Sequence, residues 1–171
     1  MDVHQAIKNR RSVRSYKSDL VPEDKLARVL EAARMAPSAH NDQDYKFIVV
    51  KNPETRKQLA DASRSQEFIT QAPVVIVAVS LNPEAIMSSG VPTYAVDVAI
   101  AINHIMLQAW EEGLGTCWIG AFSQDRVKEI LSIPDKYKVV ALFPLGHPAD
   151  SPETKTRKEL KEIVCQETFN E

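Results

Sequence analysis

Six consecutive apolar residues, Val-Val-Ile-Val-Ala-Val at positions 74–79, constrain the fold of this chain more than any other feature of its sequence. A strand with one face in water alternates apolar and polar residues, and this run does not alternate. We therefore expect a central strand that is covered on both faces. The chain has 171 residues, of which 44% are hydrophobic, so it can build the core that such a strand needs. The sequence predicts a single domain over residues 1–171.

Helix-start patterns lie on both sides of this strand. Pro22 precedes two acids, Asn52 precedes a proline, and Ser123 precedes a segment with helical periodicity. The patterns predict helices at about residues 3–9, 22–36, 53–62, 66–71, 94–112, 124–131 and 157–164, and strands at 47–50, 74–79, 116–119 and 139–145. Alternating strands and helices indicate an α/β or α+β domain, with one mixed sheet wrapped by helices.

The longest predicted helix, residues 94–112, is apolar on more than one side. Val98, Ile102 and Ile105 follow the spacing of one buried face, and Ile100 and Leu107 add a second apolar face. A helix that is apolar on most sides is buried in a core or against a partner subunit. This pattern is a first indication of a dimer.

Composition and absent motifs argue against several classes of protein. The net charge of −2 gives no general attraction to nucleic acid or to an anionic membrane, and the longest apolar stretch, residues 72–79, is too short to span a bilayer. The sequence contains no GxxxxGK[ST], GxGxxG, HExxH, CxxC or GxSxG motif. Cys117 and Cys165 lie outside any ligand spacing, so we expect no metal site and no disulfide framework. Because the first residues also lack the apolar run of a signal peptide, we expect a cytoplasmic protein.

Three arginines, Arg10, Arg11 and Arg14, are the most suggestive chemical feature. A guanidinium group matches pairs of phosphate oxygens, and the hydroxyl of Ser12 adds a donor at the same place. The segment is suited to hold one phosphate monoester, and a solvated basic turn is the alternative. A nucleic-acid-binding role is disfavoured because of the net charge, and because Tyr16 is the only aromatic residue near these arginines.

A second basic cluster lies near the other end of the chain and contains Lys155, Arg157 and Lys158. Two basic clusters suit a dianion if the fold brings them together. The pattern alone does not say whether it does.

Residues 37–41, Pro-Ser-Ala-His-Asn, are predicted to form a loop of small and polar residues. Such a loop lets a planar ligand approach the backbone, and the amide of Asn41 can pair with a donor and an acceptor on a heterocycle edge. An ordinary turn at the end of a helix is the alternative. For His40, a proton donor and an exposed loop residue both stay open.

Three other residues have a structural and a functional interpretation. His104 is expected to be a satisfied core or interface residue, and Cys117 a small buried hydrophobe. Trp118 is expected to fill the core, with stacking on a ligand ring as the alternative.

Four segments, in this order along the chain, together resemble the nitroreductase family of FMN enzymes. Residues 7–14, Ile-Lys-Asn-Arg-Arg-Ser-Val-Arg, are similar to the family's RRSVRxY/F segment. Residues 36–43, Ala-Pro-Ser-Ala-His-Asn-Asp-Gln, are similar to its APSAxNxQPW loop. Residues 113–120, Gly-Leu-Gly-Thr-Cys-Trp-Ile-Gly, resemble its GLGTxWIG strand, and residues 144–148 with 155–158 resemble its GYP and K-x-R ending. Each motif is short, but the four motifs stand at compatible spacing and together span most of the chain, from residue 7 to residue 158.

The resemblance implies an α+β fold with a mixed central β-sheet wrapped by helices, in an intertwined homodimer with two FMN sites at its interface. The helix over residues 94–112 would supply much of that interface. FMN would carry the chemistry, with no catalytic amino acid and no metal. NADH or NADPH would deliver hydride to the flavin and leave, and a small acceptor such as a nitroaromatic or a quinone would then take the electrons.

The resemblance also implies which residues hold the phosphate end of FMN. Arg10, Arg11 and Ser12 would bind the phosphate and the ribityl chain, and Lys155 and Arg157 would complete the phosphate site.

Other positions would contact the flavin ring. Arg14 would lie near the pyrimidine edge, where its charge would stabilise the reduced anion. Ile119 and Gly120 would pass beneath the ring with a backbone donor near N5, and Gln66 would contact the ring edge. The partner subunit would contribute Pro37, Ser38, Ala39 and Asn41.

The chain departs from the family pattern in two places. Asp44-Tyr45 stands where Pro-Trp usually follows Gln43, which affects the path of the loop. Residues 81–93 leave little length for the lid of larger members, so we expect an open and permissive acceptor pocket. Two alternatives stay open: an FMN-binding redox or sensing module without NAD(P)H turnover, and a specialised branch such as a reductive dehalogenase or a flavin-consuming oxidase.

Overall fold

Strand β2, Val74–Ser80, is the interior strand that the apolar run predicts, and every one of its residues is buried. The computed structural model describes residues 2–170. The sheet has the strand order β1-β2-β4-β3, where β1 is Tyr45–Val50, β3 is Gly115–Thr116 and β4 is Lys138–Gly146. All three ladders are antiparallel, and the parallel element is a single bridge between Ser12 and Thr116.

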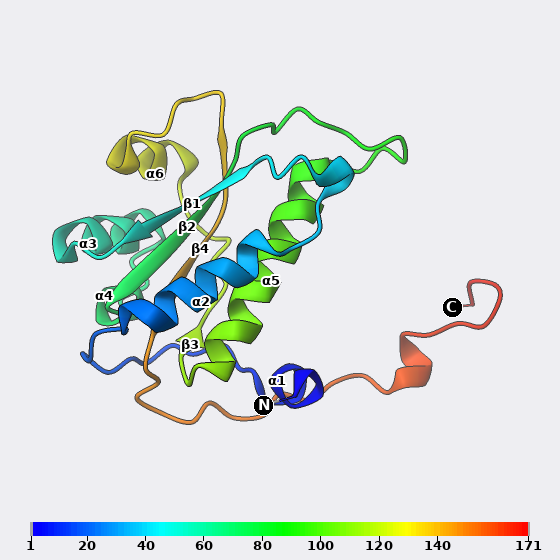
Figure 1. The fold of residues 1–171 in the computed structure, drawn as a ribbon, viewed down its shortest axis with the longest axis horizontal. Helices are drawn as coiled ribbons and strands as arrows, with labels where there is room; N and C mark the ends of the chain where they lie inside the picture. The colour runs from blue at the N-terminus through cyan, green and yellow to red at the C-terminus, as the bar shows by residue number, and fades with distance from the viewer. Residues whose placement is uncertain (1, 171) are drawn as a thin grey trace.

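Helices cover both faces of this sheet (Figure 1). The even-numbered residues 74, 76 and 78 of β2 pack into one apolar cluster with α2 and α5, and the odd-numbered residues 75, 77 and 79 pack into another with α3, α4 and α6. The helices are α2 (Glu23–Arg34), α3 (Pro53–Ala62), α4 (Phe68–Gln71), α5 (Thr93–Glu111) and α6 (Gln124–Leu131). The predicted α+β class, a central sheet wrapped by helices, is confirmed.

Side-chain caps explain why several helices begin where the sequence predicts. The Asn52 side chain accepts a hydrogen bond from the Thr55 amide at 3.0 Å at the start of α3. Ser123 caps α6 in the same way, and Asp2 caps α1 (Val3–Asn9). Each cap satisfies an amide that the first helical turn leaves without a partner.

The predicted helix over residues 157–164 is wrong. The structure has only a short 3₁₀ turn, η2 (Leu160–Glu162), within a segment that leaves the body of the molecule (Figure 1). Residues 153–170 of this C-terminal arm, which we define as residues 150–170, are all exposed. A helix this short gains its stability from packing, and every residue from 157 to 164 is exposed.

Two other elements are shorter than predicted. Helix α4 begins at Phe68, and residues 66 and 67 form a turn before it, in which the Ile69 amide donates to the Gln66 carbonyl at 3.0 Å. Strand β3 ends at Thr116, and Ile119 returns to the sheet through an isolated bridge to Leu142. Residues 117–118 therefore leave the ladder beside the sheet edge.

Close packing against β3 holds the arginine-rich segment and gives a test of the fold. A Cβ atom added at Gly115 would lie 2.5 Å from a methyl carbon of Val13. We expect Gly115→Ala to lower the free energy of unfolding by about 1–3 kcal/mol, as overpacking does, in urea denaturation. Gly120→Ala is the matched control, since its Cβ would meet only Trp118 Nε1 at 3.6 Å. Equal stability of the two variants would contradict this packing.

Candidate functional site

Residues 10–16 leave α1 and run beside β3. The Val13 amide donates to the Thr116 carbonyl at 2.9 Å, and the Val13 side chain is fully buried. The Tyr16 hydroxyl donates to the Val13 carbonyl at 2.7 Å. In an extended segment, burial of one side chain turns its two neighbours to the opposite side, which here are Ser12 and Arg14.

A cavity of about 370 Å³ joins the two basic clusters of the sequence. The guanidinium of Arg11 donates to Thr154 Oγ1 at 3.1 Å and so ties the C-terminal arm to the arginine segment. The cavity is lined by Arg10, Arg11, Ser12, Arg14, Lys155 and Arg157, together with Asp150, Pro152 and Glu153. All the predicted phosphate ligands therefore lie in one place, with Arg14 beside them.

The cavity carries an excess of positive charge, because its lining holds five cationic side chains and two carboxylates. Burial lowers the pKa of Arg10, and the charges of Arg157 and Arg11 lower it further. Arginine stays protonated at neutral pH, so the repulsion remains in the protein alone. An anion with several acceptor oxygens would relieve this repulsion, and a phosphate monoester has that chemistry.

Ile119 and Gly120 differ in what their amides can do. The Ile119 amide donates to the Leu142 carbonyl at 2.9 Å, and the Ile119 side chain is buried. The Gly120 amide has no acceptor within residues 2–170, and Gly120 is exposed. Of the two predicted residues, Gly120 is therefore the one whose backbone can donate to a ligand.

Gln66 follows the end of α3, which is hydrogen-bonded to the chain after Gly120. The Ser123 amide donates to the Ala62 carbonyl at 2.8 Å, which joins that chain to the end of α3. The side-chain amide of Gln66 donates to the carbonyl of the neighbouring Ser63 at 2.9 Å. Its carbonyl oxygen is left to accept from a ligand.

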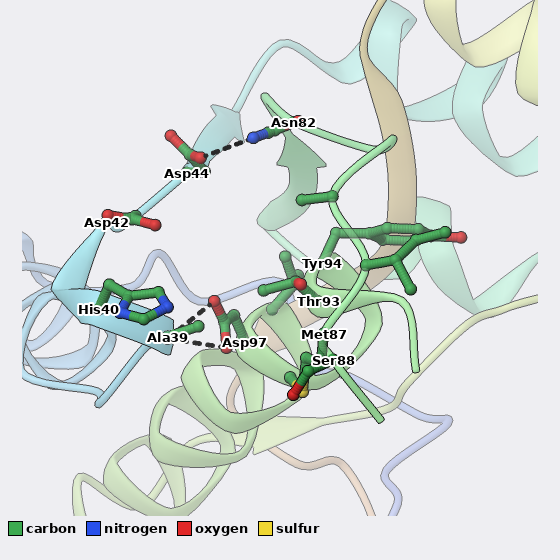
Figure 2. A pocket seen from close by; sticks show the side chains of 13 residues that line it. Ala39, His40, Asp42, Asp44, Asn82, Met87, Ser88, Thr93, Tyr94 and Asp97 are labelled. Carbon is green, nitrogen blue, oxygen red and sulfur yellow. Dashed lines mark hydrogen bonds between the residues drawn. The ribbon is translucent and has the colours of Figure 1, made fainter. Parts of the chain in front are cut away.

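Residues 37–41, the loop predicted to line the flavin ring, form a tight turn that lies against the first turns of α5. The turn contains a 3₁₀ helix, η1 (Ala39–Asn41). Figure 2 shows Ala39 joined by hydrogen bonds to Asp97, a residue of α5. Beside the loop lies a cavity of about 510 Å³, whose lining includes His40, Asp42 and Asp44 from the loop side. No three His, Cys, Asp or Glu side chains of residues 2–170 are grouped as around a metal ion.

The two halves of the predicted site lie at opposite ends of α5 in one chain. The loop attaches at Asp97 near the start of the helix, whereas the arginine segment attaches to Thr116 just after its end. At about 1.5 Å per residue, the helix from Asp97 to Glu111 spans about 21 Å. Pro37, Ser38, Ala39 and Asn41 line none of the arginine cavity.

Four single-residue expectations have different outcomes. Cys117 is buried as expected, and burial raises the pKa of its thiol. His104 is half-buried, and its Nδ1 lies 3.3 Å from the Ala32 carbonyl oxygen, as expected of a satisfied residue. The core position expected for Trp118 is wrong, because the side chain is 39% exposed beside Gly120. His40 is an exposed loop residue at the edge of the larger cavity.

Asp97 is the residue that the sequence patterns did not identify. It lies in an apolar helix, one and two helical turns before Ala101 and Ile105, which are both fully buried. A lone acid in register with buried positions is the pattern that could have revealed it, since a buried charge needs a partner.

Comparison with known proteins gives consistent matches. The nitroreductase family model matches residues 7–67 and 63–147. A nitroreductase family protein from Clostridium novyi NT has a solved structure that is 42% identical, with a TM-score of 0.84 over 91% of this chain and 89% of that one. A relative from Methanothermobacter thermautotrophicus, whose name pairs NADH dehydrogenase with NAD(P)H nitroreductase, is 36% identical over 160 residues, 91% of this chain and 82% of its own.

A solved structure of NADPH:FMN oxidoreductase from Vibrio harveyi, complexed with NAD⁺, is 26% identical, with a TM-score of 0.90 over 99% of this chain and 78% of that one. The family model and the matched relatives each cover most of the chain, and the matched residues of the family model include residues 10–14 of the arginine cavity and the loop at residues 37–41. The chain belongs to the nitroreductase family.

Proposed function

We propose that the protein is an FMN-dependent oxidoreductase that passes electrons from NADH or NADPH to a small acceptor such as a nitroaromatic or a quinone. The observation that carries this proposal is the cationic cavity, which joins residues 10–14 to residues 155–157 beside β3. The name of the Vibrio harveyi neighbour, NADPH:FMN oxidoreductase, supports the same cofactor and the same class of electron donor.

The arginine cavity fits the phosphate end of FMN. Arg10, Arg11 and Arg157 would neutralise the phosphate dianion, with Lys155 as a further point charge and Ser12 as a hydroxyl donor. The fit rests on the lining of the cavity, where five cationic side chains face two carboxylates and Arg10 is partly buried beside Arg157 and Arg11. Binding the dianion replaces the repulsion between these cations by charge-assisted hydrogen bonds.

The neighbouring backbone and side chains suit the flavin ring. The free amide of Gly120 would donate to the ring, and Gln66 would contact its edge, while Ile119 stays anchored in the sheet. Arg14 would place a positive charge near the pyrimidine edge, where it favours the reduced, anionic form. When bound, FMN would accept two electrons and release them, so no side chain needs to act as a nucleophile.

The separation of the two half-sites supports a homodimer with FMN at its interface. In one chain, the loop at residues 37–41 attaches to α5 at Asp97, about 21 Å along the helix from its end at Glu111. The arginine segment pairs with Thr116 after that end. A second copy of the chain would bring its loop to the arginine cavity, so Pro37, Ser38, Ala39 and Asn41 would serve the partner's FMN.

Exposed apolar side chains support the same assembly. Val3, Ile7 and Met35 are 72%, 59% and 65% exposed and lie near a cavity of about 570 Å³ between α1, α2 and α5. The C-terminal arm exposes further apolar side chains, namely Leu160, Ile163, Val164 and Phe169. Exposed apolar side chains in such number are typical of a protein interface, and we propose that the arm packs on the second copy.

The remaining expectations are part of the same proposal. Residues 1–171 form one domain, and neither nucleic acid nor a membrane is a partner. No helix within residues 2–170 combines the length and apolarity needed to cross a membrane. Both cysteines are free thiols, which fits a reducing cytoplasm.

An absorbance spectrum tests the proposed activity. With FMN added, we expect the purified protein to show a bound flavin spectrum that bleaches anaerobically with NADH or NADPH and returns when a quinone or a nitroarene is added. Bound flavin that neither nucleotide bleaches would favour a binding module without turnover. If the oxidised flavin spectrum returned only when a halogenated aromatic was added, a dehalogenase branch would be favoured. A protein that bound no flavin would contradict the proposed cofactor.

Removing one phosphate ligand tests the proposed cofactor site. We expect Arg157→Ala to raise the Kd for FMN about 10- to 150-fold in flavin fluorescence titration, because it removes a charge-assisted contact worth about 1.5–3 kcal/mol. Lys158→Ala is the matched control, since Lys158 is the next residue of the arm and does not line the cavity. Equal Kd values for the two variants would show that the phosphate lies elsewhere.

A further inference from the structure

Asp97 is a buried carboxylate at the wall of the cavity of about 510 Å³ beside the loop. It is 7% exposed on α5 and is the only Asp, Glu, Lys, Arg or His among the buried residues of the described chain. No lysine, arginine or histidine of residues 2–170 forms a salt bridge with it. Burying a charge without a counter-charge costs free energy that hydrogen bonds must offset. The position therefore calls for a reason beyond packing.

The hydrogen-bond partner of Asp97 is the ring-lining loop. The Ala39 amide donates to both carboxylate oxygens, at 3.2 and 3.1 Å. Figure 2 shows these two bonds joining the loop to the helix. Within the described chain, residues 38–42 make no other hydrogen bond to anything outside residues 37–43. Asp97 is the polar link between this loop and the body of the molecule.

The loop has a backbone that needs such a link. His40, Asn41 and Gln43 have φ values of 51°, 60° and 55°, in the left-handed region that residues other than glycine seldom adopt. Backbones of this kind persist when the surrounding structure holds them. The bonds inside the loop, such as the Gln43 amide to Ser38 Oγ at 3.1 Å, close the turn but do not fix its position on α5.

We propose that Asp97 is a positioning residue for the FMN site, which it reaches through the loop of its own chain. This inference rests on the proposed function, in which that loop lines the partner's flavin. The carboxylate draws the Ala39 amide toward α5 and holds the turn in its left-handed path before FMN binds. Ser38 and Asn41 are then held in place for the ring, and binding requires less ordering of the loop.

Substitutions at position 97 test the proposal. We expect Asp97→Ala to raise the Kd for FMN at least tenfold, and Asp97→Asn, which keeps one acceptor oxygen, at least threefold but less than the alanine variant. Asp44→Asn is the control, because Asp44 lines the same cavity but bonds Asn82 at 3.3 Å instead of the loop. Unchanged FMN affinity in the Asp97 variants overturns the proposal. If Asp97→Ala does not fold, the Kd of Asp97→Asn for FMN is the measurement that tests the proposal.

Mixed dimers separate positioning from a general loss of structure. Two differently tagged chains, one with Asp97→Ala and one with Arg157→Ala, are co-expressed and the mixed dimer is purified through both tags. One of its sites combines the intact cavity of the first chain with the intact loop of the second, so we expect one site of parental affinity. The other site carries both defects.

The outcomes of this experiment distinguish two failures. A mixed dimer without a tight site, from two folded parents, overturns the proposed action of Asp97 across the interface. If Arg157→Ala alone leaves FMN binding unchanged, the proposed phosphate site fails. If only Asp97→Ala leaves it unchanged, the proposed function stands and the role of Asp97 fails.

Discussion

Burial of one face of α5 sets the geometry on which the candidate site depends. Val98, Ile102 and Ile105 are fully buried between the sheet and α2, so the helix is held along its length. Its start carries the loop through Asp97, and its end leads directly into β3, where the arginine segment pairs. Because a packed helix does not shorten, the two half-sites stay apart in one chain. The proposed assembly of two chains follows from this separation.

Repulsion between cations shapes the other half of the site. Arg10 is partly buried against the charges of Arg157 and Arg11, and Val13 prevents the segment from moving away because it packs against β3. The hydrogen bond from the Val13 amide to the Thr116 carbonyl therefore helps to hold the positive side chains together. Their repulsion costs free energy, which a bound dianion would offset. The protein would supply charge and orientation, and the flavin would supply the redox chemistry.

Local chemistry let the sequence predict most elements of the fold. The run at residues 74–79 predicts the interior strand, and Asn52 and Ser123 mark the starts of α3 and α6. The final helix was predicted wrongly because periodicity does not reveal whether a segment has a surface to pack on. Within the described part of the chain, residues 158–164 line neither the arginine cavity nor the two larger cavities beside α5, and the C-terminal arm is exposed from residue 153 to residue 170.

The candidate site was less accessible to local patterns. Spacing alone left Arg10 to Arg14 as either a phosphate site or a solvated turn, and only the fold joins them to Lys155 and Arg157 in one cavity. Trp118 was expected in the core because large aromatic residues are usually buried there, but the break after β3 leaves it exposed. Asp97 escaped notice because its role depends on a loop 58 positions away in sequence.

The central claim is that each FMN is held by two chains, and native mass spectrometry of the protein with limiting FMN tests it most directly. We expect flavin on dimers only, with at most two FMN per dimer and none on the monomers present at low protein concentration. Monomers that retain FMN as well as dimers do would contradict the shared site. The loop at residues 37–43 would then have no part in binding the cofactor.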